Sequence, residues 1–553
     1  LVTPAGHAVD HESVRVGFRQ VDIRDGVLRV NGQRLIVRGT NRHDHHPAKG
    51  RAMSVDDLRD EIIAMKRLNF NAVRTSHYPD HTAWYDLCDE YGIYVVDEAN
   101  LETHGVHAQL SRDPAWMTAY LQRAQRMALR DRNHPCIVVW SLGNESGYGP
   151  HHTAMAAWLR EFDPTRAVQY ESGFPGPAIS DIMVPMYPKL DWVREVLADP
   201  AETRPMIMCE YAYSKGNANG NFFKFWDMVE EYDRFQGGFV WDWAEKALVR
   251  EVDGRNEWAY GNEFDGGIGP DGHPYGHDGR ENPQMCLNGV VMPDLTPKPG
   301  AYELMKVQAP VRFTVAWGDS IGESRLTVAN RYLALDLSHL EIEWALRRDG
   351  TVIASGSLPP LTIPPGSDEA IGMPADMPSV EDAGGEHFLS MVARHKNATT
   401  WCEAGHAVAW DHFAVPATKP RTAVSALSGT DEVRLRTEPD RFLVEAGQNT
   451  LEFDRETGEL CELRKGGDSL LSRPLRHNFM RARTDNDYMI GNPGNYYEQW
   501  TVAGLDRLRT ERIDCSATPL NDHLVLVRSE QRFAPEPSGA GLTIRSRRTG
   551  SPR

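Results

Sequence analysis

Two apolar runs that each end in a glutamate dominate the pattern of hydrophobic and polar positions. Residues 136–146 read CIVVWSLGNES, and residues 204–212 read RPMIMCEYA. A continuous apolar run rich in β-branched residues predicts a strand buried on both faces, as in a parallel sheet. Side chains at the carboxyl end of such a strand line the crevice where α/β folds place their chemistry. Glu145 and Glu210 are therefore a candidate pair of acids at one sheet edge.

Strand and helix patterns alternate from residue 34 to residue 311. The candidate strands are Leu35–Gly39, Ala72–Ser76, Tyr94–Glu98, Ile137–Leu142, Val168–Glu171, Asp181–Tyr187, Met206–Glu210 and Gly238–Asp242. Several helical segments between them begin at a capping residue, as SVDDLRDEIIAMKRLNF does. The alternation predicts a (β/α)8 TIM barrel. A doubly wound open sheet is the alternative, but it would carry a glycine-rich phosphate loop where this chain has GTNRHDHH.

The segments on either side of this region lack the helical period. Residues 1–33 alternate between apolar and polar positions and hold hairpin signals, so we interpret them as the tail of an upstream β-sandwich. Residues 312–420 and 421–553 also alternate and predict β-sandwich domains, the second cut short. The Pro-, Ser-, Gly- and Arg-rich residues 535–553 predict a frayed tail. The fold class is thus α/β followed by all-β.

Charge and cysteine usage restrict the partners and the compartment. The formal net charge of −18 disfavours nucleic acid and anionic membranes as partners. No apolar run approaches the ~20 residues of a membrane span. The chain starts Leu-Val-Thr-Pro without a methionine or a signal peptide, which indicates an internal start. Seven scattered cysteines without a CxxC pattern predict free thiols in a reducing cytoplasm.

Two acidic side chains that face each other suit the cleavage of a glycosidic bond. One must be protonated to give a proton to the leaving oxygen, and the other must be ionised to attack the anomeric carbon. A separation of about 5–5.5 Å between the carboxyl groups gives retention of configuration, and a wider one gives inversion. The alternative for either glutamate is a buried salt bridge.

Three further patterns carry candidate chemistry. Glu98, Glu102 and His104 lie in EANLETHG and could hold Mg²⁺ or Mn²⁺, although a hydrogen-bonded loop would use the same residues. Residues 41–47, NRHDHHP, suit recognition of sugar hydroxyls or plain loop structure better than zinc, because adjacent loop residues rarely point at one ion. Trp241 could be a platform for the apolar face of a sugar, or a core residue.

Seven sequence motifs occur in a fixed order along the chain. They are RGTNRHDHHP, FNAVRTSHYP, YVVDEANLETHG, RDRNHPCIVVWSLGNESG, RPMIMCEYA, QGGFVWDW and CLNGVV. In this order they resemble the bacterial β-galactosidases of the lactose-operon type, in glycoside hydrolase family 2. The resemblance covers the barrel nearly end to end and continues more weakly to about residue 535. It implies a TIM barrel over 34–311, an immunoglobulin-like sandwich over 312–420 and a truncated galactose-mutarotase-like sandwich over 421–553, with residues 1–33 ending an upstream immunoglobulin-like domain.

The same resemblance implies a retaining enzyme that cleaves terminal β-D-galactosides such as lactose. Glu145 would be the acid/base, and Glu210 would be the nucleophile that forms a covalent galactosyl-enzyme. The implied substrate-binding residues are Asn144, His43, His77, Arg74, Tyr187, Tyr213, Trp241 and Glu210. Glu102, His104 and Glu145 would bind Mg²⁺ (or Mn²⁺), and Asn288 with the carbonyl of Met285 would bind Na⁺.

The sequence departs from the family pattern in three ways. Tyr213 stands where the family has a histidine that contacts the sugar's 6-hydroxyl region. The family's N-terminal jelly roll is missing, and so is the end of its C-terminal domain. We therefore expect little activity from this chain by itself, and a homo-oligomer or a complementing chain in the complete protein.

Other functions stay open at this stage. A β-glucuronidase or another family 2 glycosidase is the nearest alternative, and a non-catalytic sugar-binding subunit is the alternative from another class. A β-glucuronidase needs cations against the sugar carboxylate, whereas residues 260–283 hold five acids and one arginine. The acids are Glu263, Asp265, Asp271, Asp278 and Glu281, against Arg280.

Overall fold

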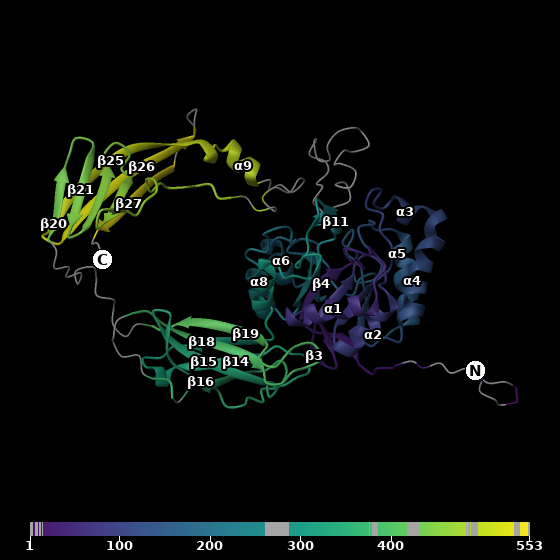
Figure 1. Cartoon of the computed structure of the whole chain (residues 1–553). Coiled ribbons are helices and arrows are strands. Elements are labelled where there is room, and N and C mark those ends of the chain that lie inside the picture. Colours follow the sequence, from purple (N-terminus) through teal and green to yellow (C-terminus); the bar gives the residue numbers. More distant parts are fainter. Residues whose placement is uncertain are drawn as a thin grey trace. The chain divides into compact units, whose positions relative to one another are not determined.

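The chain forms two compact units, Leu1–Thr418 and Lys419–Arg553, each described here by itself. The computed structural model describes residues 15–259, 287–374, 376–378, 385–416, 432–482, 496–535 and 542–550, together with positions 4, 5, 9, 13, 484 and 487. For residues 511–513 and 542–550 only the backbone is described. Figure 1 follows the elements along the chain.

Seven parallel strands form the centre of the first unit, in the order β8-β7-β6-β5-β4-β10-β9. They are β4 (Val37–Arg42), β5 (Ala72–Thr75), β6 (Tyr94–Glu98), β7 (Ile137–Ser141), β8 (Ala167–Gln169), β9 (Met206–Tyr211) and β10 (Phe235–Val240). Nearly every residue in them is buried, as their apolar runs predicted. Each neighbouring pair is parallel.

An irregular segment, residues 181–187, lies between β8 and β9 and closes the seven strands into a ring. The backbone N–H of Asp181 donates to the carbonyl of Val168 at 2.8 Å, which joins the segment to β8. Isolated parallel bridges from Met183 and Met186 join it to β9. Pro185 interrupts the segment, and a proline has no N–H for a regular ladder. The predicted TIM barrel is therefore confirmed, with its sixth strand reduced to single bridges.

Helices alternate with the strands and cover the barrel (Figure 1). They are α1 (Val55–Arg67), α2 (Thr82–Tyr91), α3 (Gln109–Arg112), α4 (Met117–Asp131), α5 (Pro150–Phe162), α6 (Leu190–Ala198), α7 (Phe223–Glu231) and α8 (Pro299–Val307), with the 3-10 turn η1 (Pro114–Trp116). Ser54 and Asp57 form a reciprocal capping box at the start of α1. The largest buried rings of the shared core are Trp84, Trp140 and Trp243.

A three-stranded antiparallel sheet covers the amino end of the barrel strands. It consists of β1 (Val21–Arg24), β2 (Val27–Val30) and β3 (Gln33–Arg34). Leu28 and Val30 are buried in one cluster with Val139. The side chain of Gln236 at the start of β10 bonds the backbone N–H and carbonyl of Leu28, at 2.7 and 2.9 Å. Residues 21–34 therefore pack on the barrel, whereas the assignment of residues 1–33 to an upstream sandwich stays a prediction.

A β-sandwich follows the barrel in the same unit. One sheet contains β13 (Val311–Ala316), β14 (Arg325–Asn330) and β17 (Asp368–Gly372), and the other contains β15 (Leu340–Arg348), β16 (Thr351–Ser357), β18 (His387–His395) and β19 (Ala407–Ala414). Inward residues such as Trp344 and Met391 form its core. The amide of Asn69 donates to the carbonyls of Met305 and Val408, both at 2.9 Å, and so ties the sandwich to the barrel. The hairpin β11 (Leu248–Val252) and β12 (Arg255–Ala259) follows β10.

The second unit is antiparallel throughout its two sheets. One holds β20 (Val433–Thr437), β21 (Arg441–Ala446), β22 (Asn449–Asp454), β23 (Leu460–Lys465) and β24 (Asp468–Ser469). The other holds β25 (Leu508–Asn521), β26 (Leu524–Pro535) and β27 (Leu542–Gly550), and α9 (Tyr496–Val502) precedes it. The prediction of a frayed tail is wrong for β27, because the backbone of that strand pairs with β26.

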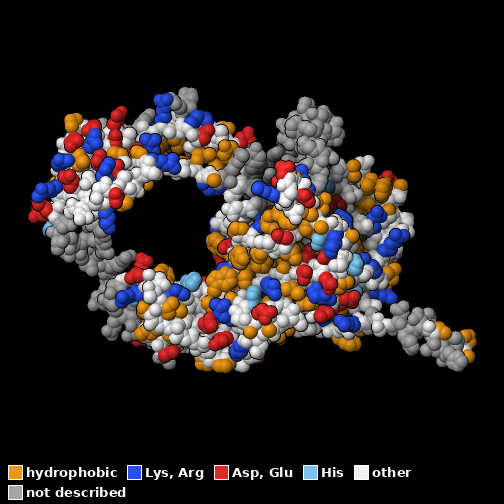
Figure 2. All heavy atoms as spheres, viewed as in Figure 1, with side chains coloured by type: hydrophobic (Ala, Val, Ile, Leu, Met, Phe, Trp, Pro, Cys, Tyr) orange, Lys and Arg blue, Asp and Glu red, His pale blue; other side chains and the backbone are white. Residues whose placement is uncertain are grey.

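Acidic and basic side chains are interspersed over the described surface in Figure 2. Among the described residues, no helix combines the length and the apolar character needed to span a bilayer.

Replacing Gln236 by leucine should destabilise the barrel. The amide is buried and satisfies three backbone groups of Leu28 and Leu35, which leucine would leave without partners. We expect a loss of about 3 kcal/mol in the free energy of unfolding, measured as a lower urea midpoint. Gln33→Leu, at an exposed position on β3, is the matched control. Equal midpoints for the two variants would contradict the role of Gln236.

Candidate active site

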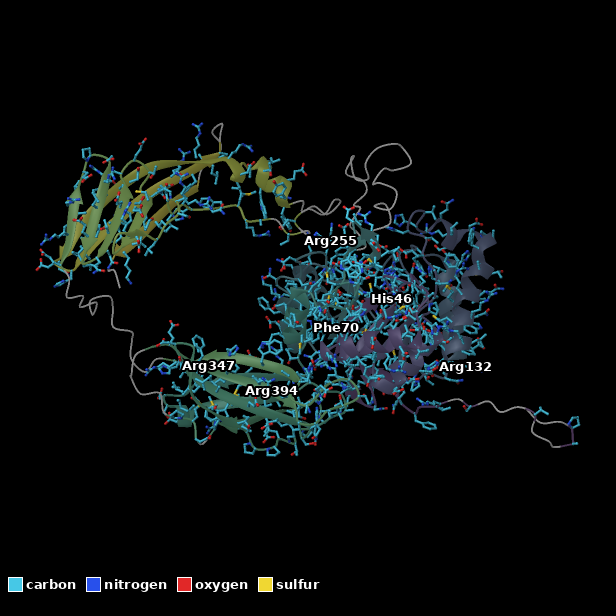
Figure 3. The ribbon with its side chains drawn as sticks, viewed as in Figure 1. His46, Phe70, Arg132, Arg255, Arg347 and Arg394 are labelled. Atoms are coloured by element: carbon cyan, nitrogen blue, oxygen red, sulfur yellow. The ribbon has the colours of Figure 1, made fainter. Side chains whose placement is uncertain are left out.

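The carboxyl ends of the barrel strands gather the predicted site residues. His46 and Phe70, both labelled in Figure 3, mark the two ends of the barrel: His46 follows β4, and Phe70 precedes β5. On the His46 side, the first four strands bring His43 after β4, Arg74 and His77 at β5, Glu102 and His104 after β6, and Asn144 and Glu145 after β7. The rest of the ring brings Tyr187 before β9, Glu210 on β9, Tyr213 after β9 and Trp241 after β10.

Arg74 is the centre of the polar network at this end. Its guanidinium has no exposed surface and donates to both oxygens of Glu98, at 2.8 and 3.1 Å. A third bond, at 3.0 Å, reaches Oε1 of Glu210. Two more reach the amide oxygens of Asn41 and Asn144, at 2.9 and 2.8 Å. A planar fork with five N–H donors can hold this many acceptors at fixed angles, so Arg74 sets the relative positions of four strand ends.

Glu210 is held at both of its oxygens. Arg74 bonds Oε1, and the hydroxyl of Tyr187 donates to Oε2 at 2.8 Å. The backbone N–H of Tyr187 also donates to the carbonyl of Glu210, which places the phenol beside the carboxylate. The side chain of Glu210 is only 5% exposed. Donors at both oxygens stabilise the negative charge of this carboxylate and fix its direction.

Glu145 lies in a different environment. Its side chain is 33% exposed. Its backbone has a φ of 39°, a left-handed conformation that residues other than glycine rarely adopt. The backbone N–H donates to Oε1 of Glu171 at 2.6 Å and so anchors this turn. Burial, and then the negative charge of Glu210, raise the pKa of Glu145 above its ordinary value. The two carboxyl groups are therefore within electrostatic range of each other, and Glu145 holds a proton more readily than a solvent-exposed glutamate does.

Aromatic rings line the space beside the two acids. The imidazole of His77 bonds Glu98 at 2.8 Å through Nδ1, and its Nε2 lies 3.8 Å from Oε1 of Glu210. The same ring stacks on Trp241, with centroids 5.3 Å apart and an interplanar angle of 12°. His43 meets Trp241 edge to face at 5.7 Å. Burial holds the pKa of His43 well below its usual range, so this imidazole is neutral.

Glu102, His104 and Glu145 form a cluster that could hold a metal ion. One ligand atom of each lies within 4.8 Å of those of the others. The backbone N–H of Asn144 donates to Leu101, which ties the loop after β6 to the loop after β7. Two carboxylates and one imidazole suit Mg²⁺ or Mn²⁺. These two loops, far apart in sequence, therefore bring together one candidate ligand set.

Of the two residues assigned to Na⁺, the structure describes only Asn288. Met285 lies outside the described residues. Asn288 is buried, and its Oδ1 accepts a hydrogen bond from Nζ of Lys246 at 2.9 Å. Tyr213 lies beside Tyr187, with ring centroids 6.0 Å apart.

Sequence reasoning missed several residues that position the site. Ser141 donates to Oε2 of Glu98 at 2.7 Å, and Oγ of Ser146 accepts from the backbone N–H of Thr103 at 2.9 Å. Glu171, which anchors Glu145, has its pKa raised to about 8 by burial. The signal that could have found them is their place at or just after the end of a buried strand, because polar residues there must be paired.

Comparison with known proteins gives matches along most of the chain. The family model described as glycosyl hydrolases family 2, TIM barrel domain, matches residues 21–313. The models for β-galactosidase domain 4 and for the β-galactosidase small chain match residues 326–416 and 445–547.

Curated relatives are similar over nearly all of the chain. A protein named β-galactosidase 2 from Enterobacter cloacae is 40% identical over 537 residues, which cover 94% of this chain and 50% of the relative. A β-galactosidase from Vibrio cholerae is 39% identical over 546 residues, covering 95% of this chain and 51% of the relative. The chain spans about half the length of these relatives. Among solved structures, an FMN-binding β-glucuronidase from Facaelibacterium prausnitzii L2-6 matches with a TM-score of 0.43 and 17% sequence identity. The match covers 74% of this chain and 60% of the β-glucuronidase chain, and this similarity is too low to decide the substrate.

Replacing Arg74 by lysine should destabilise the first unit strongly. A lysine keeps the charge but has three N–H donors, so it cannot make the five bonds of the guanidinium, and some buried acceptors would lose their partner. Removing one member of a buried ion pair costs about 3–5 kcal/mol, which urea unfolding would report. Arg24→Lys, in an exposed pair with Asp22, is the control and should leave the midpoint unchanged. A stable Arg74→Lys protein would show that the network is not needed for folding.

Proposed function

This chain belongs to glycosyl hydrolase family 2, and we propose that it carries the catalytic centre of a retaining β-galactosidase. The proposal is supported by the different environments of two neighbouring acids. Glu210 accepts hydrogen bonds from Arg74 and Tyr187, whereas Glu145 has a raised pKa. One stabilised carboxylate and one acid that holds its proton are what glycoside cleavage needs. The substrate is a terminal non-reducing β-D-galactoside such as lactose, a choice supported by the names of the curated relatives.

The reaction proceeds in two displacements. The carboxylate of Glu210 attacks the anomeric carbon while Glu145 gives its proton to the leaving oxygen, so that a covalent galactosyl-enzyme forms. Glu145, now ionised, takes a proton from water, and that water breaks the bond to Glu210. Glu145 is thereby protonated again, and galactose leaves with its original configuration.

The surrounding side chains bind and orient the sugar. Tyr187 and Arg74 fix the direction of the Glu210 carboxylate that attacks the anomeric carbon. Asn144, His43, His77 and Tyr213 offer hydrogen-bonding groups to the sugar, and Trp241 offers an apolar ring face. The presence of two acids together with these binding groups favours an enzyme over a non-catalytic sugar-binding subunit.

Glu102, His104 and Glu145 would hold Mg²⁺ (or Mn²⁺) beside the acid. When bound, the ion supplies positive charge that stabilises carboxylates and polarises nearby oxygens. The donor set fits such an ion, because the ligand atoms converge and two of the three residues are carboxylates. The loop bonds around Asn144 keep these ligands in place.

The proposal also includes a cytoplasmic location and assembly with further polypeptide chain. Cys88, Cys136, Cys209, Cys402 and Cys461 are free thiols, as expected in the cytoplasm. The match of the second unit to a β-galactosidase small chain supports assembly with further chain, either in a homo-oligomer or with a complementing partner.

Glu210→Gln should abolish turnover in the protein as its complete gene encodes it. The amide is not nucleophilic, so the rate for 4-nitrophenyl β-D-galactopyranoside should fall about a thousandfold or more. Glu231→Gln, an exposed position at the end of α7, is the control. Intact mass after acid quenching should show a galactosyl adduct on the unmodified protein and none on the variant. Undiminished hydrolysis by Glu210→Gln, or an inverted first product by NMR, would refute the assignment.

Glu102→Gln and His104→Ala should each weaken metal binding. Loss of one of three protein ligands raises the dissociation constant of Mn²⁺ about tenfold or more, measured by electron paramagnetic resonance without substrate. His107→Ala is the matched control, because His107 is on the same loop, 5.5 Å from His104 between ring centroids, but outside the cluster. If all three variants bind Mn²⁺ as the unmodified protein does, the metal lies elsewhere.

A further inference from the structure

The ammonium of Lys246 lies beside Trp241, at the edge of the proposed sugar-binding site. Lys246 follows β10 by six residues, and its Nζ bonds both a carboxylate oxygen of Asp242 and Oδ1 of Asn288, the latter at 2.9 Å. Both acceptor residues are buried, and the lysine side chain itself is only 16% exposed. The ammonium also lies 5.8 Å from the centre of the Trp241 ring. It is thus fixed next to the aromatic surface beside the two acids.

This arrangement does not fit an alkali cation at Asn288. The oxygen that the family resemblance assigns to Na⁺ is the one that accepts from Lys246. A sodium ion on the same oxygen would lie a few ångströms from a positive charge in a partly buried place, where repulsion is strong. The charge of Asp242, which could otherwise attract a cation, is already paired with Lys246.

We propose that the ammonium of Lys246 is the built-in cation of the sugar site and takes the place of an alkali ion there. The inference rests on the proposed β-galactosidase function and specifies how one sugar hydroxyl is bound. An ammonium has three N–H donors, and Asp242 and Asn288 take two of them. The third has no acceptor among the described residues and is available to a hydroxyl of the substrate.

The surroundings support a role within the site and not only in folding. Trp241 connects the lysine to the catalytic centre, because its ring stacks on His77, whose Nε2 is 3.8 Å from Glu210. The charge of Lys246 also contributes, after burial, to the lowered pKa of His43. Lys298 offers a contrast: its Nζ bonds Glu245 and the carbonyl of Ser214, and no hydrogen bond joins it to Asp242 or Asn288.

Removal of the ammonium should convert the protein into an alkali-dependent one. Lys246→Gln leaves the buried carboxylate of Asp242 and the oxygen of Asn288 without a cation, which is the donor set that sodium would then satisfy. The variant should therefore bind galactosides poorly in choline chloride and recover in NaCl.

The test replaces choline chloride by NaCl at constant ionic strength, with the protein as its complete gene encodes it. For the unmodified protein, KM for 4-nitrophenyl β-D-galactopyranoside should change by less than about twofold. For Lys246→Gln, KM should fall about tenfold as sodium rises. Galactose binding, followed by tryptophan fluorescence, should show the same contrast without turnover. Lys298→Gln is the control and should acquire no sodium dependence.

The possible outcomes separate this inference from the proposed function. A KM of the unmodified protein that falls with sodium would overturn the inference while leaving the galactosidase intact, and this arm does not depend on whether a variant folds. A folded Lys246→Gln protein with unchanged KM in both salts would also overturn it. Absence of hydrolysis by the unmodified protein in every salt would instead refute the proposed function.

Discussion

One buried guanidinium connects the parts of this site. Arg74 has no contact with solvent, yet it bonds acceptors from four strand ends, among them Glu98 and Glu210. A buried cation is tolerable only when its donors are paired, and each acceptor is likewise tolerable only because the guanidinium is there. The folding requirement and the positioning of Glu210 are consequently the same set of bonds, and the carboxylate cannot turn away without leaving buried charges unpaired.

The closed ring makes such a hub possible. Parallel strands deliver their carboxyl ends to one rim, so residues distant in sequence converge there. The other rim is covered by β1–β3, which bury Leu28 and Val30 against the barrel. The sixth strand position, around Pro185, lacks regular pairing and instead brings Tyr187 to Glu210. The least regular part of the ring thus carries a direct contact to the site.

Opposite electrostatic environments distinguish the two acids and the cations near them. Glu210 lies against a guanidinium and a phenol, whereas the pKa of Glu145 is raised by burial and by the charge of Glu210. Lys246 adds a second fixed positive charge, paired with Asp242 next to Trp241. The site therefore orders its charges with side chains from the chain itself, and the cluster of Glu102, His104 and Glu145 is the place where a divalent ion would join them.

The sequence by itself determined the barrel, the sandwiches and the two acids, because alternation and apolar runs are local signals that survive without tertiary information. It also placed Glu145, Glu210 and Arg74 at or near the ends of strands, although β4 ends three residues later than predicted, at Arg42. Tertiary structure decided what each polar residue pairs with. The assignment of β1–β3 to the barrel depends on contacts with residues 208 positions away, such as Leu28 with Gln236. The occupation of Asn288 by Lys246 likewise joins positions 42 apart. Hydrogen bonds of this kind depend on distances in space that no local pattern encodes, which is why the elements could be predicted and the partners could not.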